Sequence, residues 1–309
     1  MITTVCMNPA LDKTVTVDAL VPGQVNRIRS SRTDVGGKGV NVAVVARRLG
    51  LFPVQVIGCA GVEGFRKLRD AMAREDVAQR FHTVEGAIRV NTKVVTLDGA
   101  GVTELNEPGP TLTAEDIDVF FDLAIEAAEG SDYVVVTGSL PPGCPEGTYR
   151  ELIRLLGGDR CILDVGGCEL MLGLAAQPFL VKPNHHELAA ALGRELHTLE
   201  DIRRGAEALR DAGAKNVLVS LGKDGALLVS GEGSFFAPEV PVEVHSTVGA
   251  GDALVGGLLC GLSEYGSMLE AFRCAVAAGT ASVMTEGTQL VVPEDFRSIL
   301  GRVSIEQLC

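Results

Sequence analysis

Tryptophan is absent from this chain, and its 309 residues include only three tyrosines. Purine pockets usually offer aromatic faces on which the base can stack, so this shortage argues against a nucleoside as the substrate. No apolar run approaches the eighteen or so residues that a membrane-spanning helix needs, and the short apolar start, residues 2–7, lacks the basic leader of a signal peptide. We therefore expect a cytoplasmic protein with no membrane partner.

Metal-binding cysteine pairs are also missing. The eight cysteines form no C-x-x-C motif and most lie in apolar runs, which predicts reduced thiols rather than disulfides or a zinc site. The formal net charge is −13, which argues against nucleic acid as a partner. Residues 1–50, however, carry seven Lys or Arg against three Asp. This local excess of +4 suits a small anionic ligand, although a solvated basic face explains the same count.

Strand and helix patterns alternate through most of the chain, which predicts an open, mostly parallel sheet covered by helices on both faces. We expect one domain over residues 1–309, because no repeat or low-complexity linker divides it. Period-two alternation in residues 14–18, 25–35 and 89–97 predicts half-exposed strands of a small separate sheet. Residues 99–109 are typical of a loop. Short antiparallel edge strands are predicted at residues 226–229, 234–237 and 242–245.

A Gly-rich turn followed by an apolar helix begins at Ser246. Backbone N–H groups of Gly249, Ala250 and Gly251 can approach an anion closely, and the amino end of the helix favours negative charge there. Asp252 lies at the junction, where a carboxylate can accept a proton from a hydroxyl that attacks a phosphoryl group. On spacing alone, Asp252 is equally well explained as an ordinary helix cap.

Five further blocks occur in a fixed order along the chain. They are Asn8-Pro9-Ala10-Leu11-Asp12, Gly36-Gly37-Lys38-Gly39-Val40-Asn41, Gly138-Ser139-Leu140-Pro141-Pro142-Gly143, Lys182-Pro183-Asn184 with Glu187, and Ser220-Leu221-Gly222 with Gly225. Together with Thr247–Asp252, they resemble the ribokinase/phosphofructokinase-B family of sugar kinases over nearly the whole chain. The resemblance implies a ribokinase-like three-layer α/β/α sandwich with a small β-sheet lid, formed here by residues 12–35 and 88–108. In several members of the family the lid is also the dimer interface, so a homodimer is implied.

The resemblance also assigns residues to the sugar phosphate. It implies binding by Asp12, Gly36, Gly37, Asn41 and Ser139, with Lys38, Arg27, Arg89 and Lys93 as candidates for the phosphate group. Asp12 alone would more simply be a turn-capping residue, and each basic residue a surface charge. Arg89 and Lys93 lie four apart on an alternating strand, so their side chains share one face.

For the nucleotide, the resemblance implies ATP bound by Lys182, Asn184, Ser220, Gly222, Gly225, Thr247 and Gly251. Gly279 lies on a late helix with a surface of small residues against which adenine could lie, although such surfaces usually reflect close packing of helices. Glu187 is implied to reach Mg²⁺ through water, since Mg²⁺ keeps much of its hydration shell. Several relatives hold a monovalent cation beside the turn at Gly249, which implies a K⁺ site. His185 and His186 diverge on a helix and have no third ligand at suitable spacing, so we interpret them as surface residues.

The function implied is ATP-dependent phosphorylation of the free primary hydroxyl of a ketohexose monophosphate. Turning a ketohexofuranose ring over nearly exchanges its C1 and C6 positions, so the residues alone leave fructose 1-phosphate, fructose 6-phosphate and tagatose 6-phosphate open. The resemblance favours fructose 1-phosphate, because Arg89-Val90-Asn91-Thr92-Lys93 has a basic residue at both ends. A nucleoside kinase of the same fold and a non-catalytic sugar-phosphate-binding regulator are the alternatives.

Overall fold

A ten-stranded sheet forms the centre of the molecule. The computed structural model describes residues 1–99, 101–285 and 289–308. The order of the strands in this sheet is β14-β13-β12-β11-β10-β9-β8-β1-β4-β5, and neighbours from β11 to β5 pair in parallel. The strands are β1 (Ile2–Cys6), β4 (Val54–Glu63), β5 (Ala78–Ala87), β8 (Tyr133–Thr137), β9 (Cys161–Asp164), β10 (Leu180–Val181), β11 (Asn216–Ser220), β12 (Ala226–Ser230), β13 (Gly233–Ala237) and β14 (Glu306–Leu308).

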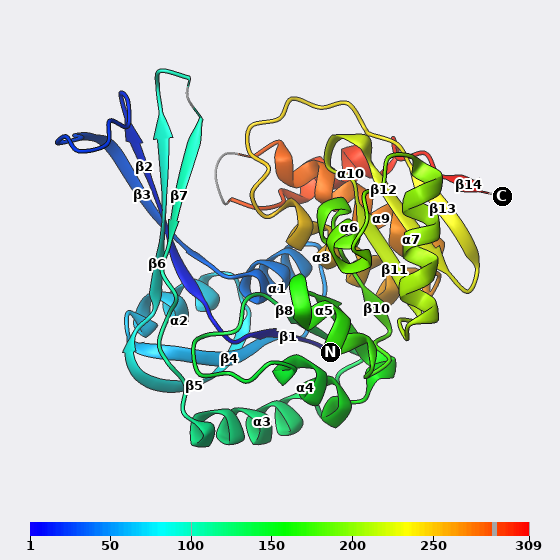
Figure 1. Cartoon of the computed structure of the whole chain (residues 1–309), viewed down its shortest axis with the longest axis horizontal. Helices are drawn as coiled ribbons and strands as arrows, with labels where there is room; N and C mark the ends of the chain where they lie inside the picture. The colour runs from blue at the N-terminus through cyan, green and yellow to red at the C-terminus, as the bar shows by residue number, and fades with distance from the viewer. Residues whose placement is uncertain (100, 286–288, 309) are drawn as a thin grey trace.

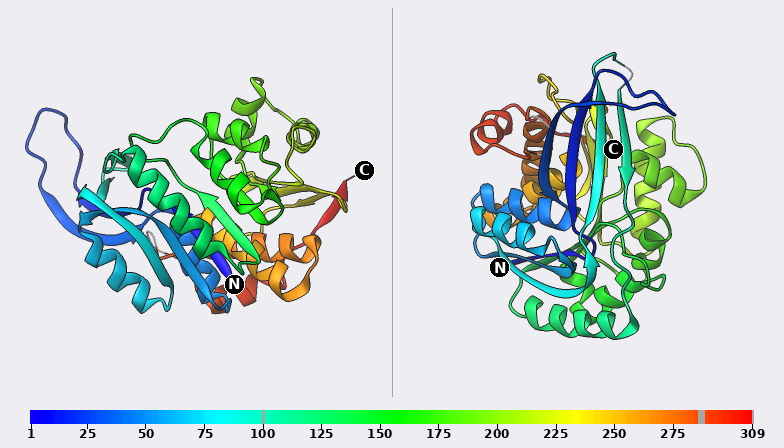
Figure 2. Two further views of the ribbon diagram at one scale, coloured as in Figure 1. Left: turned by 90° about the horizontal axis from the view of Figure 1, so that it is seen from below. Right: turned by 90° about the vertical axis from the view of Figure 1, so that its left-hand side faces the viewer.

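Helices cover both faces of this sheet (Figures 1 and 2). One face carries α1 (Lys38–Arg48), α2 (Phe65–Arg74), α8 (Ala250–Tyr265), α9 (Met268–Val283) and α10 (Pro293–Leu300). The other face carries α3 (Ala114–Ala128), α4 (Thr148–Leu156), α5 (Gly167–Leu174), α6 (His185–Leu192) and α7 (Leu199–Asp211). Alternate residues of β4 enter the two cores, Val54 and Val56 on one side and Ile57 and Cys59 on the other. The predicted three-layer α/β/α sandwich is confirmed.

A second, four-stranded sheet projects from the body (Figure 1). Its order is β3 (Ile28–Gly36), β2 (Ala10–Val17), β6 (Arg89–Thr96) and β7 (Val102–Asn106). Strands β2 and β3 are antiparallel, β2 and β6 parallel, and β6 and β7 antiparallel. The predicted small separate sheet is therefore present.

Two predictions, the edge strand at residues 242–245 and the loop at residues 99–109, are wrong. Residues 242–245 form no strand; instead β14, from the end of the chain, pairs with β13. Pro238 and Pro241 precede the expected strand and provide no N–H for a ladder, which weakens strand formation there. Residues 99–109 contain strand β7, whose five residues are all exposed and so give no apolar alternation.

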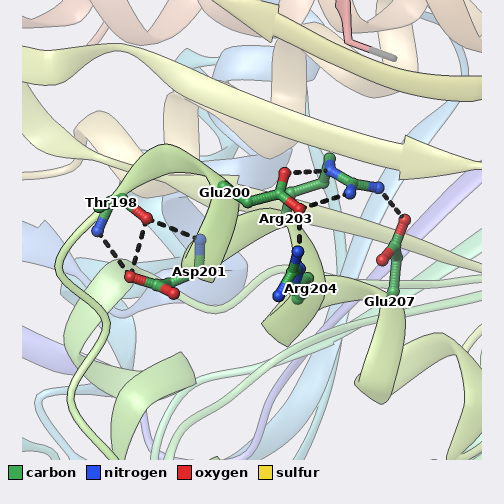
Figure 3. Close-up of polar contacts among 6 residues, drawn as sticks. All are labelled: Thr198, Glu200, Asp201, Arg203, Arg204 and Glu207. Atoms are coloured by element: carbon green, nitrogen blue, oxygen red, sulfur yellow. Dashed lines mark hydrogen bonds and ion pairs between the residues drawn. The ribbon is translucent and has the colours of Figure 1, made fainter.

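The side chains of helix α7 show how local sequence fixes an element (Figure 3). Thr198 Oγ1 accepts a hydrogen bond from the Asp201 amide at 3.1 Å, and the Asp201 carboxylate accepts one from the Thr198 amide at 3.0 Å. This reciprocal capping box sets the start of the helix. Arg203 then donates to Glu200 at 2.7 Å, one turn earlier, and to Glu207, one turn later. Ion pairs three or four residues apart on one helix each add only a few tenths of a kcal/mol to its stability.

The described residues include no helix both long and apolar enough to cross a membrane. Seven cysteines lie within the described ranges, and all seven are free thiols, as predicted. The eighth, Cys309, lies outside those ranges.

Candidate active site

A cavity of about 500 Å³ lies between the small sheet and the carboxyl ends of β9, β10 and β11. Its wall also includes the amino ends of helices α1 and α8. The lining residues are Asp12, Gly37, Lys38, Asn41, Arg89, Asn91, Lys93, Glu104, Asn106, Asp164, Lys182, Asn184, Glu187, Ser220, Thr247, Val248, Gly249, Gly251 and Asp252. In open parallel sheets the carboxyl ends of the strands are the usual location of ligand sites.

Most of the residues singled out in the sequence meet in this cavity, although seven do not line it. Gly36 packs directly against the Asp12 carboxylate, and Ala250 follows Gly249 in the first turn of α8. Arg27 is exposed in the connection between β2 and β3, and Ser139 is exposed in the turn after β8. Gly222 and Gly225 shape the β11–β12 turn. Gly279 packs on α8, where a Cβ would meet the Ala250 carbonyl at 3.5 Å.

The Gly-rich turn has the geometry that its sequence predicts. Gly249 has φ 81°, in the left-handed region that favours glycine, and it is the N-cap of α8 without any side-chain cap bond. The N–H groups of the first turn have no partners within the helix and lie at its positive end. Asp252 is therefore not an ordinary cap: Asn41 Nδ2 donates to its Oδ2 at 2.7 Å.

The environment of Asp252 raises the pKa of its carboxyl group to about 7. Burial is the largest cause, since the residue is only 6% exposed, and the negative charge of Asp164 adds to it. The Asn41 hydrogen bond and the cations Lys38 and Lys182 act in the opposite direction. A carboxylate with a pKa near neutrality suits general-base catalysis.

Asp164, which sequence reasoning missed, neutralises the two lysines of the cavity. Its Oδ1 lies 3.0 Å from Lys182 Nζ and 3.7 Å from Lys38 Nζ, and Thr137 Oγ1 donates to its Oδ2 at 3.1 Å. Burial alone would raise the pKa of Asp164, but the two ammonium groups and Thr137 outweigh burial and lower it. Asp164 is the last residue of the buried strand β9, and polar residues at such strand ends are the signal that would have identified it.

The small sheet contributes two rows of polar side chains. Asp12, Asn91 and Asn106 are paired across β2, β6 and β7, and Lys93 is paired with Glu104 two residues further along the same face. Asn91 Nδ2 donates to Asp12 Oδ1 at 3.1 Å. The buried Oδ1 of Asn91 has no hydrogen-bond partner within the described structure. Asn106 and Glu104 were missed because β7 was not recognised as a strand.

Asn184 and Glu187 form the capping box of helix α6. Asn184 Oδ1 accepts from the Glu187 amide at 2.8 Å, and Glu187 Oε2 accepts from the Asn184 amide at 2.8 Å. Their spacing thus has a structural role in addition to a place in the cavity wall. Among the residues with described positions, no group of three or more His, Cys, Asp or Glu could hold a metal ion.

Comparison with known proteins identifies the family. Residues 6–295 match the family model of the pfkB family carbohydrate kinases. The 1-phosphofructokinase of Rhodobacter capsulatus is 38% identical over 99% of this chain and 98% of its own length. Escherichia coli phosphofructokinase-2 in complex with potassium has a TM-score of 0.90 and 32% identity, covering 97% of this chain and 98% of that chain. In complex with fructose-6-phosphate, the same protein has a TM-score of 0.89 and 31% identity, with the same coverage. The chain therefore belongs to the pfkB family of carbohydrate kinases.

Proposed function

We propose that this kinase transfers the γ-phosphoryl group of ATP to the free primary hydroxyl of fructose 1-phosphate, giving fructose 1,6-bisphosphate. The observation that carries the proposal is the buried carboxylate of Asp252, with its pKa raised to about 7, directly after the Gly249–Gly251 turn. The full-length similarity to a 1-phosphofructokinase supports the choice of acceptor.

In this proposal Asp252 accepts the proton of the attacking hydroxyl, and Asn41 holds its carboxylate in place. The amides of Gly249, Ala250 and Gly251 stabilise the negative charge that develops on the transferred group. A Cβ on Gly251 would lie 3.4 Å from Lys182 Nζ, so the Lys182 ammonium group lies beside this turn. These positive groups fit the phosphates of a nucleotide.

Magnesium fits the same end of the cavity. Mg²⁺ commonly takes one or two protein carboxylates and completes its shell with water and substrate phosphates. Asp164, which lies 3.0 Å from Lys182, and Glu187 both line the cavity and provide such carboxylates. We assign ATP to Lys182, Asn184, Ser220 and Thr247, and Mg²⁺ to Glu187. When bound, MgATP supplies the phosphoryl group. The potassium-bound relative supports a K⁺ site near Gly249.

The small sheet is assigned to the sugar phosphate. Asp12 and Asn91 offer acceptor oxygens for sugar hydroxyls, and the unpartnered Oδ1 of Asn91 is suited to receive one. Arg89 and Lys93 on the same face provide the charges for the phosphate group. We further propose that residues 12–35 and 88–108 close as a lid on a single kinase domain, excluding water from the transfer.

The acceptor is tested by measuring kcat/KM for fructose 1-phosphate, fructose 6-phosphate and tagatose 6-phosphate at fixed MgATP. We expect fructose 1-phosphate to have the highest value and tagatose 6-phosphate a lower one. The fructose-6-phosphate complex of a relative makes fructose 6-phosphate the second candidate. A higher value for either alternative would overturn the acceptor assignment, whereas the assignment of Asp252 as base would stand.

A further inference from the structure

A second cavity, of about 560 Å³, lies on the other side of helix α1. We call it the α2 cavity, because helix α2 provides much of its wall. Strands β2 and β3, helix α1 and residues 289–292 complete the wall. Its volume matches that of a site for a small organic molecule. None of the roles assigned to the active-site cavity explains it.

The charges of the α2 cavity favour an anion. Its three carboxylates already face arginines: Asp34 lies 2.7 Å from Arg32, Asp70 lies 3.6 Å from Arg69, and Glu75 lies 2.6 Å from Arg48. The cavity's other two cations, Lys67 and Arg74, lie on helix α2. Within the described part of the chain neither has a carboxylate partner. The lining residues alone balance, three carboxylates against three cations, but Arg32 and Arg69 add two positive charges beside Asp34 and Asp70. Among the described residues, the charge around the cavity is therefore positive.

The rest of the wall is largely apolar. Val40 and Val44 of α1, Ala71 and Met72 of α2, and Leu290 are among its lining residues. An apolar wall bordered by two uncompensated cations suits a ligand with an apolar body and an anionic group. Inorganic phosphate alone would leave the apolar wall uncovered.

Two residues of the α2 cavity also touch the catalytic groups. Asn41 lines both cavities and donates the hydrogen bond to Asp252. Leu290 packs against the anion turn, since a Cβ on Gly249 would lie 2.8 Å from its Cδ2. Arg48 donates to the carbonyls of Gln289 and Val291, on either side of Leu290. A ligand in the α2 cavity therefore contacts the supports of both the base and the turn.

We propose that the α2 cavity is a regulatory site for a small organic anion, whose binding lowers the rate of phosphoryl transfer through Asn41 and Leu290. Its kinetic consequence rests on the proposed function, whereas binding does not. The ligand acts without occupying the substrate site, so inhibition is non-competitive with both substrates.

The test uses 8-anilinonaphthalene-1-sulfonate, a fluorescent probe with an apolar body and one sulfonate group. We expect it to bind the full-length protein in the presence of saturating sugar phosphate and MgATP, and to lower kcat about twofold or more with little change in either KM. The double variant Lys67→Ala/Arg74→Ala should weaken binding about fivefold or more, since two charged contacts are lost. The matched control, Arg66→Ala/Arg154→Ala, removes the same total charge from exposed positions that do not line the cavity and should bind within about twofold of wild type.

A second variant, Ala71→Phe, fills the cavity from helix α2 and should abolish probe binding. The proposal is overturned if the probe does not bind, if either substrate displaces it, or if Lys67→Ala/Arg74→Ala and the control bind equally well. Probe binding is measured without turnover, so failure of the proposed acceptor would be seen separately in the acceptor series.

Discussion

At the scale of single residues, the site depends on two buried carboxylates with opposite tasks. Asp164 stays ionised because Lys182 and Lys38 lie within 4 Å of it, and its charge then makes ionisation of Asp252 harder. Asn41 partly offsets this effect by donating to Asp252. The environments thus separate the pKa values of two like groups, as expected where one of them must exchange a proton.

The first prediction concerns the base. Asp252→Asn preserves the shape of the side chain but cannot accept the proton, so kcat should fall about 10²–10⁴-fold. The affinity for sugar phosphate should change much less. Steady-state kinetics and a direct binding titration measure the two effects. A variant whose kcat stays within about threefold of wild type would exclude Asp252 as the general base.

The second prediction is a pH dependence. Asp252 must be ionised to act as a base, so kcat/KM for the acceptor should rise with pH through about 7 and then level off. Asn41→Ala removes a hydrogen bond that favours the ionised form, and so should move the inflection to higher pH. The pH profiles of wild type and variant at fixed MgATP provide the measurement. An inflection that moves to lower pH would contradict this account of Asp252.

The same shift predicts a change in stability. The pKa of Asp252 is higher in the folded protein, about 7, than its ordinary value of 3.8, so the protonated carboxyl stabilises the fold at low pH. This contribution is lost as pH rises from about 4 to above 7. Asp252→Asn should therefore gain unfolding free energy relative to wild type across that range, as measured by urea denaturation. A difference that is independent of pH would contradict the raised pKa.

The fourth prediction concerns the phosphate on the acceptor. Lys93→Ala should raise KM for the sugar phosphate about tenfold or more and leave KM for ATP nearly unchanged, because a charged hydrogen bond to phosphate is lost. Lys13→Ala is the matched control, since Lys13 pairs with Thr92 and therefore faces the other side of the small sheet. A larger effect on KM for ATP would show that the assignment of Lys93 to the sugar phosphate is wrong.

At the scale of elements, the buried strands of the main sheet were predicted better from the sequence than the exposed strands. Strands β1, β8 and β9 are short segments rich in apolar residues and buried on both faces, the pattern from which a central parallel sheet is predicted. Exposed strands carry no such signal: β7 has no buried residue, and β14 is three residues long and depends on pairing with β13. The β13–β14 pairing also joins distant parts of the chain, which local patterns do not encode, whereas β7 pairs with its neighbour β6.

The same limit of local sequence patterns explains which site residues were identified from the sequence and which were missed. Asp252 and Gly249 lie in one short motif, so sequence alone identified them together. Asn106 and Asp164 come from strands that reach the cavity only through the fold. Gly279, a candidate for the nucleotide, does not line the cavity. Small residues on a helix indicate close approach but not its partner, and here the partner is helix α8.

The fifth prediction tests this close packing. In α8, a Cβ on Gly257 would lie 2.4 Å from the Cys274 carbonyl and 2.5 Å from the Ala278 Cβ. Gly257→Ala should therefore force α8 and α9 apart and cost about 1–3 kcal/mol of unfolding free energy. Gly301→Ala is the control, because Gly301 has φ −71° and no atom within 4 Å of the added Cβ. Denaturation in urea should leave that variant within about 0.5 kcal/mol of wild type. Equal effects of the two substitutions would contradict the packing argument.

At the scale of the whole molecule, exposed apolar side chains concentrate on the small sheet and its connections. Ile28 of β3 is 53% exposed, and Val102 and Leu105 of β7 are each 59% exposed. Small sheets left with apolar side chains in water commonly bury them against a partner. We propose that a second copy of the chain covers these side chains in a homodimer formed through this sheet.

Charge placed on this surface should separate the subunits. The double variant Ile28→Glu/Leu105→Glu leaves the main cores untouched but puts two carboxylates into the proposed interface, where burying unpaired charge is costly. Analytical ultracentrifugation should show a dimer for wild type and a monomer for the variant at the same concentration. Ile125→Glu, at a position 45% exposed on helix α3, which packs on the main sheet, should remain dimeric. If closure of the lid depends on the partner, the monomeric variant should also show a lower kcat and a higher KM for the sugar phosphate, while its KM for ATP changes less. A monomeric wild type, or a variant that stays dimeric, would rule out this interface.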